Sequence, residues 1–81
     1  MKILLYRGLD THGIPGYAKL AAYLEADDFS SADVKKIGDN LYRARLDRSN
    51  RLLFALYRHG EERYALILEY IHQHAYEKSR F

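Results

Sequence analysis

The chain has 81 residues, of which 48% are hydrophobic and 30% charged, and its formal net charge is +2. This length gives one domain over residues 1–81 with no second core, and the composition excludes a disordered or low-complexity protein. Because the sequence contains no cysteine, disulfides and cysteine-ligated metal sites are excluded as well.

The first apolar run is short and predicts a strand over residues 3–6. It ends at Arg7, which makes it too short for the core of a signal peptide or for a membrane span. The absence of cysteine suits a reducing compartment. We therefore expect a soluble cytoplasmic protein that does not bind a membrane.

An amphipathic helix is predicted from about residue 15 to 26. Pro15 suits the first turn of a helix, where its missing N–H is not needed. Five apolar residues recur at helical spacing over this segment: Ile14, Tyr17, Ala18, Ala21 and Leu24.

A second, shorter helix is predicted from Ser30. The Ser30 side chain is placed to cap the backbone while Asp33 reaches back, as in a capping box. Phe29 and Val34 occupy the positions of a hydrophobic staple. Gly38 then suits the residue that follows a helix, where a left-handed conformation is common.

From residue 41 the hydrophobic period changes to two, which predicts three strands over residues 41–47, 51–58 and 63–71. In the first, Tyr42, Ala44 and Leu46 share one face and Arg43 and Arg45 the other. In the last, the shared face carries Tyr64, Leu66, Leu68 and Tyr70. The element order predicts an α+β domain, β-α-α-β-β-β, with two helices packed on one face of a mainly antiparallel four-stranded sheet.

Arginine is concentrated in these strands, since seven of the eight arginines lie in residues 41–81. That half has eight Lys and Arg against five Asp and Glu, or +3, whereas residues 1–40 have five against six, or −1. A guanidinium group can bind phosphate through two hydrogen bonds and can stack on bases. Arginines on a solvated strand face also keep a small sheet soluble, so both interpretations remain open.

The chain resembles the RelE/ParE toxin superfamily over nearly its whole length. The segments that carry the resemblance are Leu41-Tyr42-Arg43-Ala44-Arg45, Asn50-Arg51-Leu52-Leu53-Phe54, Ala65-Leu66-Ile67-Leu68-Glu69 and His72-Gln73-His74-Ala75-Tyr76. Within that superfamily, residues 72–81 look most like RelE-like modules that precede UvrD/Rep-type helicase regions. The resemblance implies the amino-terminal part of a longer helicase-type protein, although these 81 residues contain no Walker motif for ATP.

RelE-type toxins, as the resemblance implies, cleave mRNA in the ribosomal A site through its own 2′-hydroxyl. That reaction needs a base, an acid and cations that stabilise the phosphorane charge. The matching nucleic-acid-binding positions are Arg43, Arg45 and Arg51, and the matching catalytic positions are His72, His74 and Tyr76. If the chain stays extended, Tyr70, His72, His74 and Tyr76 share one face, so that one phosphate could meet several of them.

Structural interpretations of these residues stay open beside the catalytic one. His72 and His74 also suit an ordinary surface, and no third ligand lies near them in the sequence, so we predict neither a metal site nor a cofactor. Glu69, inside an apolar strand, either pairs with Arg43 or Arg51 or lies at an exposed end of the sheet.

Three functions follow as hypotheses. The first is a RelE-like nucleic-acid-associated module that serves as the accessory domain of a UvrD/Rep-type DNA helicase and binds RNA or DNA. The second is a ribosome-dependent mRNA endoribonuclease toxin of a type II toxin–antitoxin system. The third is a non-catalytic protein-interaction domain with an antitoxin-like or helicase partner.

Overall fold

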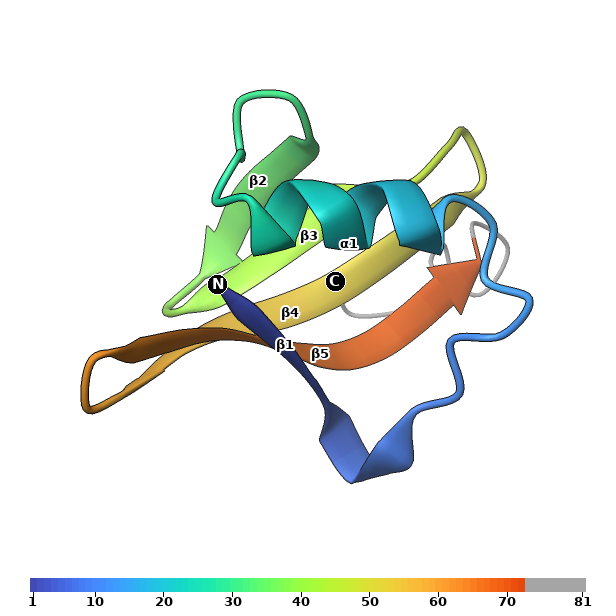
Figure 1. The fold of residues 1–81 in the computed structure, drawn as a ribbon. Helices are drawn as coiled ribbons and strands as arrows, with labels where there is room; N and C mark the ends of the chain where they lie inside the picture. The colour runs from blue at the N-terminus through green and yellow to red at the C-terminus, as the bar shows by residue number, and fades with distance from the viewer. Residues whose placement is uncertain (73–81) are drawn as a thin grey trace.

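A computed structural model describes residues 1–72 of the chain, in which one α-helix lies across one face of a five-stranded sheet (Figure 1). The strand order is β1-β5-β4-β3-β2, with β1 parallel to β5 and every other pair antiparallel. In chain order the elements are β1 (Lys2–Leu5), the 3-10 turn η1 (Tyr6–Gly8), α1 (Tyr17–Glu25), β2 (Asp33–Gly38), β3 (Leu41–Arg45), β4 (Asn50–His59) and β5 (Glu62–His72).

The predicted fold class is wrong in one element. The first strand, the helix within residues 15–26 and the three carboxy-terminal strands are all present near their predicted positions. The predicted second helix is instead the edge strand β2. The domain therefore has one α-helix on a mixed five-stranded sheet, not two helices on a four-stranded, mainly antiparallel one.

Local hydrogen bonds explain why no helix starts at Ser30. The Ser30 hydroxyl donates to Asp28 Oδ1 at 2.9 Å, and the N–H of Ser31 donates to the same oxygen at 3.1 Å. These bonds build a turn around Asp28, and the Ser30 side chain is used there rather than as a helix cap. Val34 then pairs with Ala44, so that the backbone of β2 is satisfied by β3. An isolated helix of this length would be marginal in water.

Asn40 ends the β2–β3 hairpin and ties it to β4. Its φ of 52° is left-handed, a conformation that asparagine tolerates better than most residues. Its side-chain amide donates to Leu56 O at 2.7 Å, and its side-chain oxygen accepts from Leu56 N at 3.0 Å. The amide therefore takes the place of the next β3 residue beside β4.

The core lies between α1 and the sheet. Phe54 is at its centre, with Tyr42 and Phe29 stacked on it at ring-centroid distances of 5.4 and 6.4 Å. The fully or nearly fully buried members are Ile14, Leu20, Leu24, Ala44, Leu52, Phe54, Ala65 and Ile67.

The opposite face of the sheet, which we call the open face because no described helix covers it, carries the residues that alternate with this core, and two of them, Leu53 and Ile71, are buried at 2% and 4% exposed. On β4 these are Arg51, Leu53, Ala55 and Tyr57, because Leu52 and Phe54 point toward α1. Within residues 1–72 no helix covers the open face. None of the helices in this part of the chain is long and apolar enough to cross a membrane.

Candidate nucleic-acid interface

The three arginines predicted to bind nucleic acid, Arg43, Arg45 and Arg51, all lie on the open face. Arg45 and Arg51 are partners across β3 and β4, and Arg43 is two residues from Arg45 on the same strand. The side chain between them, Ala44, is fully buried under α1, which directs both arginines to the other side. Lys35 joins them from β2 as the partner of Arg43. We call Lys35, Arg43, Arg45 and Arg51 the cationic cluster.

Of this cluster, Arg45 has a carboxylate partner within residues 1–72. Its Nε lies 3.6 Å from Asp33 Oδ2, and both side chains are about half exposed, at 49% and 57%. An exposed pair of this kind contributes at most about 1 kcal/mol, because water and salt screen it. Asp33 therefore leaves Arg45 able to exchange this partner for a phosphate.

Arg43 and Arg51 differ in how their guanidinium groups are held. The Arg43 Nε is buried and has no hydrogen-bond partner in the described part of the chain. Arg51 Nη1 donates to Asp47 O at 2.6 Å and to Asn50 O at 3.2 Å, which fixes it over the β3–β4 connection. A guanidinium has five N–H donors, so both groups keep donors for a further acceptor.

Glu69 is the carboxylate that the sequence left unassigned. It lies exposed on the open face as the β5 partner of Leu53, and it forms no ion pair with Arg43 or Arg51. The four cations of the cluster against Asp33 and Glu69 give this part of the face a charge of 4 − 2 = +2.

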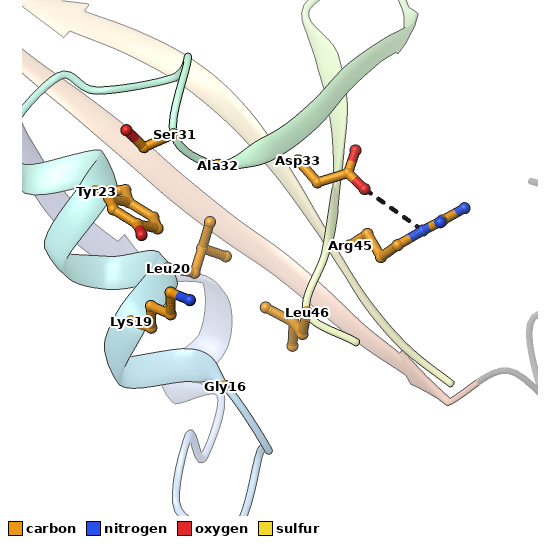
Figure 2. Close-up of a pocket in the computed structure, with 9 residues that line it drawn as sticks. All are labelled: Gly16, Lys19, Leu20, Tyr23, Ser31, Ala32, Asp33, Arg45 and Leu46. Atoms are coloured by element: carbon orange, nitrogen blue, oxygen red, sulfur yellow. Dashed lines mark ion pairs between the residues drawn. The ribbon is translucent and has the colours of Figure 1, made fainter. Parts of the chain in front are cut away.

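A cavity of about 200 Å³ adjoins the cluster between α1 and the β2–β3 edge. Figure 2 shows Lys19 and Tyr23 on the α1 side of it, while the Asp33–Arg45 pair points away from the helix. Arg45 thus stands at the boundary between the open face and the cavity. This cavity could not be predicted from the sequence. Residues 31–33, which form one wall of it, lie in the segment that has the pattern of a second helix. Its lining residues are Gly16, Lys19, Leu20, Tyr23, Ser31, Ala32, Asp33, Arg45 and Leu46.

His72 is separated from the arginines by the sheet. It is exposed and is the β5 partner of Asn50, which shares the α1 side with Leu52. The structure therefore does not bring His72 and the cationic cluster onto one face. His74 and Tyr76, the other two predicted catalytic residues, lie outside the described residues.

Beside His72 is a polar network that the sequence did not reveal. The Tyr70 hydroxyl donates to Asn50 Oδ1, and Asn50 Nδ2 donates to both carboxylate oxygens of Asp47 at 2.8 Å. Asn50 is only 6% exposed, so these bonds satisfy a buried amide. The network closes the β3–β4 connection, and its role is structural.

Over residues 1–72, no three His, Asp or Glu side chains gather in a way that could hold a metal ion.

Comparison with known proteins assigns no family to this geometry. No protein-family model, curated protein or solved structure matches the chain. The function is therefore inferred from the residues of the open face themselves.

Proposed function

We propose that this domain binds nucleic acid, with the phosphate backbone on the cationic cluster of the open face. The observation that supports this is the grouping of Lys35, Arg43, Arg45 and Arg51 on three neighbouring strands of a face that no described helix covers. A planar guanidinium binds phosphate, as it binds carboxylate, through two parallel hydrogen bonds.

The spacing of the cluster suits a chain of phosphates. Residues two apart on one strand are about 6.7 Å apart, and partners on adjacent strands about 5 Å apart. Arg43 and Arg45 follow one another along β3, and Lys35 and Arg51 flank them from β2 and β4. Contacts of this kind position a backbone and carry no sequence information, so we expect binding with little sequence preference.

We further propose that such a module acts in the cytoplasm beside a UvrD/Rep-type helicase region, as the resemblance of residues 72–81 implies. Sequence-independent binding of a nucleic-acid backbone would suit such a role. The mRNA-cleavage hypothesis gains no support from the described residues, because His72 and the arginines lie on opposite faces. The described residues do not support an antitoxin-like partner either.

Salt dependence of binding tests the proposal. Affinity for a single-stranded oligonucleotide of about 12 nucleotides is measured by fluorescence anisotropy over a range of salt concentrations. Each phosphate contact contributes roughly 0.7 to the slope of log K against log salt for a single strand. We expect Arg43→Gln and Arg45→Gln each to reduce the slope by about that amount.

Arg58→Gln is the matched control. Arg58 is exposed on the same strand as Arg51 but on the α1 side, as the partner of Arg63. This variant should keep the wild-type slope, and urea unfolding shows that all three variants are folded. An equal loss in Arg58→Gln, or no binding by the wild type at low salt, would overturn the proposal.

A further inference from the structure

The open face continues beyond the cationic cluster into an aromatic end formed by Tyr57 and Tyr64. The two residues are partners across β4 and β5, and their ring centroids are 5.9 Å apart at an interplanar angle of 43°. Tyr57 is 50% exposed, the highest exposure among the large hydrophobic residues of the described chain. The next row of the same face holds Ala55 and Leu66.

This aromatic end is not explained by folding. Within residues 1–72 neither the Tyr57 nor the Tyr64 hydroxyl makes a hydrogen bond, and neither ring belongs to the core under α1. Beside them Leu4 is 41% exposed on β1 as the partner of Leu66. An exposed aromatic and apolar area on the same face as a cationic cluster is typical of a surface that binds another molecule.

We infer that the ligand is single-stranded nucleic acid whose bases stack on Tyr57 and Tyr64 while its backbone crosses the cationic cluster. This inference rests on the proposed function and specifies its substrate. Tyr57 follows Arg51 by six positions along β4, a distance of about 20 Å, which gives room for a few nucleotides. Bases in a duplex are stacked inside the helix and do not reach the rings, so single strands are selected.

Lys2 and Glu62 border the aromatic end. Lys2 is the β1 partner of Tyr64 and its Nζ lies 3.5 Å from Glu62 Oε1, with both side chains largely exposed. Lys2 can therefore contact a phosphate that follows the stacked bases. An acidic peptide with apolar residues is the competing occupant of such a face. A base would stack on the two tyrosine rings, whereas an acidic peptide could bind this face without stacking, so stacking distinguishes the two occupants.

Three probes of equal length separate stacking from charge: single-stranded oligothymidylate of about 12 nucleotides, the same backbone without bases, and the duplex. We expect wild-type protein to bind the thymidylate roughly five- to 150-fold more tightly than the abasic strand for each stacked base. Tyr57→Leu and Tyr64→Leu should reduce this ratio but keep the salt slope. Tyr57→Phe keeps a ring and should keep the ratio.

Tyr6→Leu is the matched control, because Tyr6 is 44% exposed on η1, outside the sheet. It should leave the ratio unchanged. Equal affinity for the thymidylate and abasic strands, or for duplex and single strand, would overturn the stacking inference, while a salt slope that depends on Arg43 would still support nucleic-acid binding. If the protein binds an acidic helical peptide and none of the three probes, both proposals fall.

Discussion

Two turns of this domain are each stabilised by one carboxylate, which accepts hydrogen bonds from residues two and three positions further along the chain. Asp47 accepts hydrogen bonds from the Asn50 side chain and from the N–H groups of Ser49 and Asn50. The bond from the Asn50 side chain, then that from the Ser49 backbone, lowers the pKa of Asp47 below its ordinary value. Asp28 is similar, since bonds from Ser31 and Ser30 lower its pKa. Both carboxylates bind their partners best when ionised.

Acid should weaken the fold through these groups. A carboxyl whose folded pKa is lowered contributes stability above its unfolded pKa of about 3.9, and this is lost as the pH falls through the folded pKa. We expect Asp47→Asn to be less stable than wild type at pH 7, with the difference shrinking below about pH 4. Urea unfolding at several pH values measures this. Glu61→Gln, in the exposed β4–β5 turn, is the control, and a difference that does not change with pH would contradict the account.

The faces of individual side chains were predictable on β3 but not on β5. Alternation on β3 correctly placed Arg43 and Arg45 opposite Ala44. On β5 the prediction that Tyr64 and Tyr70 share a face is wrong, because a bulge intervenes: Leu53 pairs with Glu69 while Phe54 pairs with Ile67. The extra residue moves Tyr70 and His72 to the α1 side. No local sequence signal marks this bulge.

Among the elements, β2 shows how tertiary pairing overrides local helix signals. Residues 30–38 have a good cap, a staple and a terminal glycine, all of which favour a helix. They form a strand because β3 offers a partner for the backbone and because Val34 packs against the core from β2. The fifth strand and the cavity beneath it could not be predicted, since both depend on this pairing.

Substitutions at two glycines test whether residues 33–38 form the strand β2 or the end of a helix. Gly38 does not have a positive φ, and an added Cβ would meet Leu41 side-chain atoms at 3.4 and 3.7 Å. Gly38→Ala should therefore change the free energy of unfolding by less than about 0.5 kcal/mol. Gly60, with φ 62° in the β4–β5 turn and open space around it, is the comparison. Gly60→Ala should cost about 1 kcal/mol or more.

Chemical denaturation measures the free energy of unfolding of Gly38→Ala and Gly60→Ala and so tests the assignment. A helix that ended at Gly38 would need a left-handed residue there, so that alanine would be as costly as at Gly60. Equal losses in the two variants would therefore contradict the assignment of residues 33–38 to a strand.

Considered as one sheet, the domain has two unequal faces. One is filled by α1 and the core around Phe54. The other carries the cationic cluster at one end and Tyr57 and Tyr64 at the other, with no described helix over them. The sequence predicted the three arginines of the cluster, because Arg43 and Arg45 alternate with buried residues, but it did not predict Lys35, whose segment has the pattern of a second helix. It did not predict the aromatic end, because tyrosines occur in almost every element and only the register of β4 and β5 pairs these two.

Nuclear magnetic resonance of the tyrosine rings tests the central claim, that the open face binds single-stranded nucleic acid. Ring signals are assigned with single Tyr→Phe variants and followed while oligothymidylate is added. We predict that the signals of Tyr57 and Tyr64 shift with the added strand, whereas those of Tyr17 and Tyr23 on α1 stay in place. Shifts confined to Tyr17 and Tyr23, or no shifts at any ring, would contradict the claim.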